Sequence, residues 1–256
     1  MHGELPNGGT SNGLPAKRLE HSRAHHEPGN DVIIVGIAGA TNAGKTTVAR
    51  RLLEEFPRSA VVHQDDFFRS VDDPAHEHVV EINHHNWDTI SAVDFERMLQ
   101  SVKENYTVLL EKNTRPVGAD SRPRLLILEG ILIFNVPQLA CLLDRKYLIT
   151  LTKEECRRRR LTRNYDPADV PGYFDLVVWP MYEKFLAQLQ GTTDIEYFDG
   201  NDASERTVQV IVSDLLNLYR ERLRNTPPSE ESPVLKNYSV GKIPRNPSGD
   251  ASVPVV

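Results

Sequence analysis

The chain has 256 residues, of which 39% are hydrophobic and 26% are charged, and its formal net charge is −6. These values are those of an ordinary soluble protein with enough apolar material for one core, so we expect one globular domain. The acidic balance disfavours a nucleic-acid partner, because no excess of Lys and Arg is available to displace counterions from a phosphate backbone. Small-molecule ligands are the better expectation.

Targeting signals and cysteines indicate where the protein works. No segment approaches the roughly 20 apolar residues that span a bilayer, and the N-terminus has no hydrophobic run typical of a secretory signal. Cys141 and Cys156 have neither a metal-binding spacing nor the density of a disulfide-stabilised fold. We expect free thiols, a cytoplasmic location with nuclear entry left open, and no membrane partner. The sequence indicates neither protein partners nor an oligomeric state.

Both ends of the chain have the composition of disordered tails. Residues 1–30 mix Gly, Pro, Ser, Asn and charge with almost no Val, Ile or Phe, which leaves too little apolar surface to offset the entropy of ordering them. Residues 225–256 contain six prolines and show no helical or strand period. The folded domain is therefore expected at residues 31–224.

Short apolar runs alternate with helical patterns along this domain. Val32–Ala38 is almost continuously apolar, as expected of a strand covered on both faces in a parallel sheet. The helix that follows has apolar residues at helical spacing and ends at Pro57. Further strands are expected at 60–64, 125–128, 147–151 and 195–198, further helices at 173–190 and 204–223, and a loop at 113–123. This alternation predicts an α/β fold with a doubly wound parallel sheet.

A phosphate-binding loop lies between the first strand and the first helix. The motif GxxxxGK[ST] is complete, and its residues are Gly39, Ala40, Thr41, Asn42, Ala43, Gly44, Lys45 and Thr46. In such a loop the backbone N–H groups surround phosphate oxygens, the lysine reaches the β- and γ-phosphates, and the hydroxyl after it can bind Mg²⁺. A glycine-containing turn that fits by chance is the alternative, and the strand-to-helix setting argues against it. The motif alone does not separate a kinase from a GTPase or a nucleotide sensor.

Three acids are expected beside this loop. Asp65 and Asp66 follow the second strand, and Glu129 ends the strand at 125–128, so all three belong to the ligand-facing edge of an open α/β sheet. The two neighbouring aspartates can divide the work of a phosphotransferase, with one holding the metal and the other accepting the proton of an acceptor hydroxyl. The alternative for each acid is a helix cap or a solvated loop end.

A run of arginines follows on a predicted helix from Glu154 to Tyr165, at positions 157, 158, 159, 160 and 163. Such a run is often only a solvated helix face. We favour a mobile lid that closes over ATP and brings arginines to the transferring phosphoryl group. The histidines at 76, 78, 84 and 85 do not predict a zinc site, because no Cys or acid completes a ligand set at a familiar spacing.

These motifs together resemble the nicotinamide riboside kinases, which are uridine-kinase-like P-loop nucleoside kinases. The blocks that carry the resemblance are GIAGATNAGKTT (36–47), HQDDFF (63–68), NWD (86–88), LILEG (126–130), EECRRRRLTRNY (154–165), PGYFD (171–175), WPMY (179–182) and YFDG (197–200). They span almost the whole folded domain in the family's order. The P-loop is generic, whereas the other blocks in combination are specific.

The resemblance implies roles for individual residues. Metal binding falls to Thr46 and Asp65, and catalysis to Asp66 as the base with Lys45 and Glu129. ATP contacts come from the P-loop with Thr47, Arg159, Arg163, Asn164 and Tyr165, and substrate contacts from Asp66, Trp87, Asp88, Arg160, Tyr165 and Asp166.

The implied substrate residues suit a cationic riboside. The carboxylate of Asp88 can accept hydrogen bonds from both ribose 2′ and 3′ hydroxyls, and the indole of Trp87 binds a pyridinium charge better than other aromatic rings do. The sequence therefore predicts Mg²⁺-dependent transfer of the ATP γ-phosphate to the 5′-hydroxyl of nicotinamide riboside, and of nicotinic acid riboside. A kinase of uridine or another nucleoside is one alternative, and a non-catalytic ATP-binding regulator is another.

Overall fold

A computed structural model describes residues 31–111, 122–202 and 205–225 of the chain. The tails predicted at 1–30 and 225–256 lie outside the described residues except for Asn225, which ends the last helix. Most of the loop predicted at 113–123 lies outside them as well. None of the helices in the described ranges is both long enough and apolar enough to cross a membrane.

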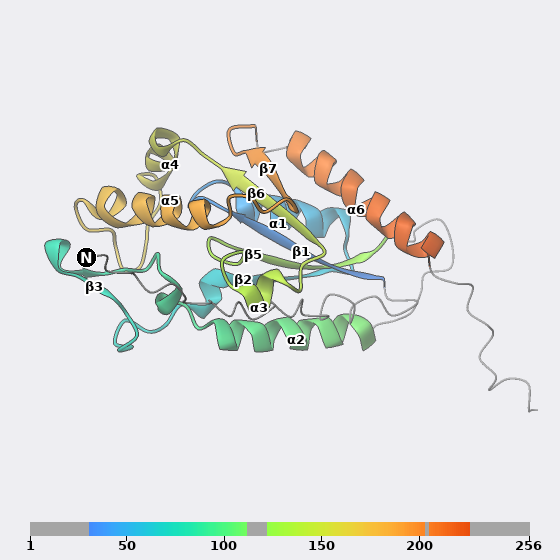
Figure 1. Cartoon of the computed structure of the whole chain (residues 1–256), viewed down its shortest axis with the longest axis horizontal. Coiled ribbons are helices and arrows are strands. Elements are labelled where there is room, and N and C mark those ends of the chain that lie inside the picture. Colours follow the sequence, from blue (N-terminus) through green and yellow to red (C-terminus); the bar gives the residue numbers. More distant parts are fainter. Residues whose placement is uncertain (1–30, 112–121, 203–204, 226–256) are drawn as a thin grey trace, which may run out of the picture.

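A five-stranded sheet with the order β2-β5-β1-β6-β7 forms the centre of the domain (Figure 1). Every pairing in it is parallel, so the predicted doubly wound parallel sheet is confirmed. The strands are β1 (Val32–Gly39), β2 (Ala60–His63), β5 (Arg124–Gly130), β6 (Arg145–Thr150) and β7 (Ile195–Asp199). All residues of β1 and β5 are buried, which explains why these strands read as continuous apolar runs.

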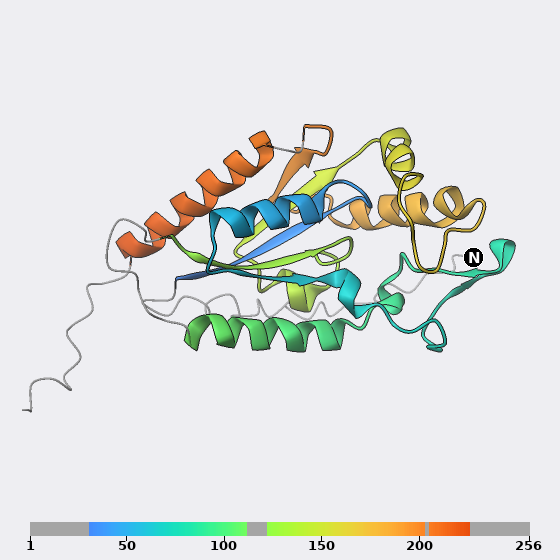
Figure 2. The ribbon, with the colours of Figure 1, turned by 180° about the vertical axis from the view of Figure 1, so that it is seen from behind.

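Helices cover both faces of the sheet (Figures 1 and 2). On one face, α1 (Lys45–Glu55) and α6 (Glu205–Asn225) pack against each other and against alternate residues of β1 such as Val35. On the other face, α2 (Phe95–Glu111) and the short α3 (Pro137–Ala140) cover the intervening residues, such as Ile34.

Helix α2 was not expected from the sequence. Its buried residues Met98, Val102 and Leu109 lie at helical spacing, so the periodic signal is present. Polar residues such as Lys103, Glu104 and Asn105 separate Val102 from the apolar run at 108–110. The other expected helices are present, although α4 (Lys153–Arg160) ends earlier than the predicted 154–165 helix.

The elements that build the site gather at the carboxyl ends of the strands (Figure 1). A 3₁₀ turn η2 (Gln64–Phe67) follows β2, and a small hairpin of β3 (His78–Val79) and β4 (His84–His85) encloses the turn η3 (Val80–Ile82). The turn η4 (Ile90–Ala92) leads into α2. Helix α4, the π-helical turn η5 (Phe174–Val178) and α5 (Trp179–Gln188) come from the second half of the chain.

Candidate active site

The P-loop adopts a conformation that its glycines allow. Gly39 has φ +143°, and a Cβ atom there would lie 2.0 Å from the carbonyl oxygen of Ile149, so no side chain fits. Gly44 precedes α1 with φ +96°, and Asn42 has φ +61°. The turn therefore brings the N-terminus of α1 and successive backbone N–H groups to one concave edge, which suits an anion.

Lys45 lies inside this turn. Its ammonium donates a hydrogen bond to the carbonyl oxygen of Ala40 at 3.0 Å. Burial lowers the pKa of Lys45, and the carboxylates of Glu129 and Asp65 act in the opposite direction. The two nearby carboxylates favour the protonated, charged form of the lysine, and that charge can bind a phosphate in the loop.

Glu129 connects three elements at the end of β5. The Thr46 hydroxyl lies 3.0 and 3.2 Å from its two carboxylate oxygens, and Nδ1 of His63 lies 2.8 Å from Oε1. Glu129 is 4% exposed, so these contacts define its position. His63 was given no role from the sequence, although it begins the HQDDFF block.

Asp65 adds a second carboxylate to the same side of the cleft. Burial raises the pKa of its carboxyl group, and the Lys45 ammonium lowers it. The side chains of Thr46, Asp65 and Glu129 all offer oxygen atoms, which are the ligands that Mg²⁺ prefers. The residues present therefore fit a magnesium ion.

Asp66 has a different position. Both aspartates are exposed, but Asp66 is not among the described residues that line the cleft, and its backbone carbonyl accepts a hydrogen bond from Arg97 of α2. The 3₁₀ turn accounts for the difference, because neighbouring residues of such a turn point in different directions. The structure brings Asp65 to the P-loop, and it does not bring Asp66 there.

Trp87 and Asp88 form the opposite wall of the cleft. The Tyr173 hydroxyl accepts a hydrogen bond from the Trp87 backbone N–H at 2.9 Å and donates one to the Asp88 carboxylate at 3.0 Å. Burial raises the pKa of Asp88, while the Arg160 guanidinium and the Tyr173 hydrogen bond lower it. Tyr173 thus holds the two predicted substrate residues together, a role that the 85-residue separation from Asp88 hides in the sequence.

Arg160 is the arginine most firmly built into the cleft. It is 9% exposed and forms an ion pair with Asp169, with an Nε to Oδ2 distance of 2.6 Å. Its guanidinium carbon lies 4.1 Å from the centroid of the Tyr165 ring, within the range of a cation–π contact. The Tyr165 hydroxyl lies 3.0 Å from Nδ2 of Asn42 in the P-loop. The segment after α4 is therefore connected directly to the P-loop.

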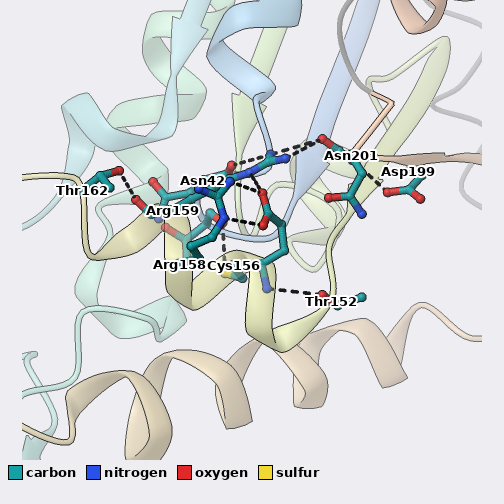
Figure 3. Close-up of polar contacts among 11 residues, drawn as sticks. Asn42, Thr152, Cys156, Arg158, Arg159, Thr162, Asp199 and Asn201 are labelled. Carbon is teal, nitrogen blue, oxygen red and sulfur yellow. Dashed lines mark hydrogen bonds and ion pairs between the residues drawn. The ribbon is translucent and has the colours of Figure 1, made fainter.

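The other arginines of this segment have separate contacts. Arg159 contacts Glu155 and donates to the backbone oxygen of Gly200. It also donates to the backbone oxygen of Asn42 (Figure 3). Arg163 donates to Oδ1 of Asn42 at 2.9 Å. Arg157 pairs with Asp175, and Arg158 with Glu155, and neither is among the described residues that line the cavities beside the P-loop. The predicted closing motion of a lid remains a prediction.

One cleft of about 960 Å³ joins these groups. It is lined at the phosphate end by Thr41, Asn42, Lys45, Thr46, Asp65, Glu129, Gly130, Ile131 and Arg163. At the other end it is lined by Phe68, His84, Trp87, Asp88, Arg160, Tyr165, Asp166, Pro167, Asp169 and Tyr173. A smaller cavity on the other side of the P-loop is lined by Asn42, Gly44, Lys45, Thr46, Thr47, Arg159, Thr162 and Arg163. The two cavities share residues of the P-loop, so a ligand bound in one cavity can meet a ligand bound in the other beside Lys45 and Thr46.

Comparison with known proteins agrees with this architecture. The family model described as "Phosphoribulokinase / Uridine kinase family" matches residues 34–195. Nicotinamide riboside kinase 2 of Homo sapiens is 37% identical over 208 residues, which cover 79% of this chain and 89% of the human protein. Nicotinamide riboside kinase 1 of Homo sapiens is 37% identical over 190 residues, covering 72% of this chain and 92% of that protein. The chain belongs to the nicotinamide riboside kinases of this family. The resemblance seen in the sequence is confirmed.

A more distant relative shows the same relationship. Nicotinamide riboside kinase of Saccharomyces cerevisiae is 28% identical over 202 residues, covering 64% of this chain and 82% of the yeast protein. As a member of this kinase family, the chain is a phosphotransferase.

Most of the predicted site residues of this kinase lie in or beside the two cavities. Asn164 lines a groove on the outer side of the arginine segment and is not among the described residues of the cleft, so the structure does not bring it to the P-loop. Ala40 and Ala43 are fully buried within the turn and contribute backbone groups only. Sequence reasoning missed Tyr173 and Asp169, although the PGYFD block already contains the tyrosine.

Proposed function

We propose that the chain is an ATP-dependent kinase that phosphorylates the 5′-hydroxyl of nicotinamide riboside, and also nicotinic acid riboside, to the mononucleotide used in NAD biosynthesis. The observation that carries the proposal is one cleft with Lys45 and Thr46 at one end and Trp87 and Asp88 at the other. A donor phosphate and an acceptor ribose bound at these ends have their reacting groups between Lys45 and Asp65.

The P-loop holds the triphosphate of ATP. Its backbone N–H groups and the N-terminus of α1 stabilise the β- and γ-phosphates, and Lys45 leaves its contact with the Ala40 carbonyl to bind them. Arg163, which lines both cavities, adds positive charge where the γ-phosphoryl group moves. Phosphoryl transfer depends mainly on such positioning and charge neutralisation, because its transition state is loose. Arg159 supports the loop from behind through Asn42.

The oxygens of Thr46, Asp65 and Glu129 would hold Mg²⁺ or its bound waters. The ion supplies neutralisation of the charge on the β- and γ-phosphates. Glu129 is already engaged by the Thr46 hydroxyl and by His63. One oxygen of Asp65 would hold the ion or one of its waters, and the other would face the acceptor.

We assign the general base to Asp65 in place of Asp66. Asp65 lines the cleft, and burial raises the pKa of its carboxyl group. A carboxylate with a raised pKa accepts the proton of the 5′-hydroxyl more readily as the oxygen attacks phosphorus. Asp66 lacks a position in the cleft for this role.

The riboside binds at the Trp87 end. Asp88 accepts hydrogen bonds from the vicinal 2′ and 3′ hydroxyls, and its contact with Tyr173 fixes the carboxylate for this purpose. The Trp87 indole and the Tyr165 ring hold the pyridinium base, and the indole attracts its positive charge. Arg160 orients Tyr165 from the other side, and Asp166 adds negative charge beside the base.

An acceptor panel tests the proposal. The purified full chain is incubated with Mg-ATP and with nicotinamide riboside, nicotinic acid riboside, uridine or cytidine, and the phosphorylated product is measured by mass spectrometry. We expect 5′-phosphorylation of both pyridine ribosides, with lower kcat/KM for uridine because a neutral base gains less from Trp87. A preference for uridine would identify the alternative nucleoside kinase, and no product from any acceptor would leave only a nucleotide-binding regulator.

A further inference from the structure

Two histidines that the proposed reaction does not use contact the substrate tryptophan. The ring centroids of His76 and Trp87 are 4.3 Å apart with planes at 59°, and those of His85 and Trp87 are 6.2 Å apart at 89°. Phe68 meets the indole edge-on at 5.9 Å. These three rings, which we call the indole cage, surround Trp87, and of the three only Phe68 is among the described residues that line the cleft.

His76 is held in one orientation by its own hydrogen bond. Its Nε2 lies 2.9 Å from the carbonyl oxygen of Ser70. A carbonyl oxygen only accepts hydrogen bonds, so the proton of the ring must sit on Nε2, and in the neutral imidazole Nδ1 is then an acceptor. The same Ser70 oxygen accepts the backbone N–H of Asp73 at 2.9 Å. The imidazole is therefore fixed to a turn that precedes the hairpin.

Polar atoms within the cage are complementary but unpaired. Within the part of the chain that the structure describes, Nδ1 of His76, Nδ1 of His85 and Nε1 of Trp87 are buried and have no hydrogen-bond partner. Nε1 of the indole is a donor, and Nδ1 of the neutral His76 ring is an acceptor. Buried groups of this kind gain free energy when they pair.

A metal ion is not the explanation for this cluster. Among the described residues, no group of three or more His, Cys, Asp or Glu side chains is arranged to hold one. His76 contacts the rings of Trp87 and His85 and the carbonyl oxygen of Ser70, and such contacts hold a ring in place.

We propose that His76 is a positioning residue that sets the angle of the Trp87 indole and thereby the affinity of the site for a cationic riboside base. This inference rests on the proposed function, since it concerns the same acceptor. The imidazole supports the indole through this ring contact, and the electron-rich face of Trp87 attracts a pyridinium ion. A positive charge at position 76 would compete for that indole and repel the base.

Kinetics of four variants of the full chain test this role. His76→Ala removes the ring, His76→Gln keeps a donor for the Ser70 carbonyl, and His76→Lys adds a fixed charge. His78→Ala is the matched control, because His78 contacts His85 at 5.8 Å on the same hairpin but has no ring contact with Trp87 among the described residues. KM and kcat are measured for nicotinamide riboside, uridine and ATP, and thermal unfolding is followed for each variant.

We expect His76→Ala to raise the KM for nicotinamide riboside by about 3- to 10-fold, the value of one lost aromatic contact. The KM for ATP and kcat should stay within about twofold, since Trp87 does not touch the phosphates. His76→Gln should recover part of the loss. His76→Lys should raise the KM for nicotinamide riboside more than that for neutral uridine, whereas His78→Ala should match the wild type.

Fluorescence gives a readout that simple loss of folding would not produce. In a Trp179→Phe background, Trp87 is the remaining tryptophan of the two in the chain, and bound nicotinamide riboside should quench it less steeply in His76→Ala. Unchanged KM and quenching in His76→Ala would overturn the inference, as would equal effects of His78→Ala. A wild-type protein that phosphorylates no riboside would instead overturn the proposed function.

Discussion

Replacing Asp65 by Asn removes the proposed proton acceptor and keeps the size of the side chain. A positioned general base contributes about 10²- to 10⁴-fold to a rate, which corresponds to about 3–5 kcal/mol of activation free energy at 1.36 kcal/mol per tenfold. We expect Asp65→Asn to lower kcat within this range, because Asp65 lines the cleft and interacts with Lys45 and Glu129. Asp65 is also one of the groups that would hold Mg²⁺, so kcat is measured at saturating Mg²⁺, where the unchanged P-loop backbone should still bind ATP.

Asp66→Asn is the matched control, because it makes the same chemical change one residue along the chain. Its side chain lies outside the cleft, so kcat should stay within about threefold of the wild type, the small effect typical of exposed sites away from the chemistry. Release of ADP with saturating nicotinamide riboside measures kcat, and calorimetry measures ATP affinity. Loss of kcat in Asp66→Asn as large as in Asp65→Asn would refute the assignment of the base.

Three further predictions concern other parts of the site. Glu129→Gln should raise the Mg²⁺ concentration for half-maximal activity by about tenfold or more, the effect typical of removing a group that supports a metal site. A titration of Mg²⁺ at fixed ATP measures this, and an unchanged requirement would remove Glu129 from the metal site. The KM for riboside should rise as the pH falls through the pKa of Asp88, because the ionised carboxylate accepts the ribose hydroxyls. Burial raises that pKa, so the rise should begin at a higher pH than for an exposed aspartate. Asp88→Asn should have a high KM without this dependence, and a wild-type KM independent of pH would contradict the role of Asp88. Gly39→Ala should lower the free energy of unfolding, measured in urea, by more than the roughly 1–2 kcal/mol that a left-handed alanine costs, because its Cβ would clash with the Ile149 carbonyl. Gly191, with φ +83°, has open space where a Cβ would lie, so Gly191→Ala should cost only the conformational strain. Equal losses in the two variants would show that the clash is relieved.

The sequence predicted those parts of the fold whose signals are local. The strand Val32–Gly39, the P-loop and α1 carry their apolar period and their motif within 24 residues of chain, and sheet topology follows from the alternation of such units. Helix α2 was missed although its buried residues have helical spacing. Its apolar positions are spread among polar residues, and their period becomes visible only when the spacing is counted along the whole segment.

The site was predictable as a set of motifs, while its internal assignments were not. Asp65 and Asp66 are identical in composition and adjacent in sequence, and only the 3₁₀ turn after β2 decides which of them faces the P-loop. Tyr173 and Asp169 gain their roles from contacts with Asp88 and Arg160. Such contacts depend on how distant segments pack, which local patterns do not encode.

The ratio of kcat/KM for nicotinamide riboside to that for uridine, measured for the wild type and for Trp87→Leu, tests the central claim most directly. The account predicts a ratio well above one in the wild type, and a fall toward one in Trp87→Leu, because the indole attracts the pyridinium charge and leucine does not. A wild-type ratio at or below one, or a ratio that Trp87→Leu leaves unchanged, would contradict it.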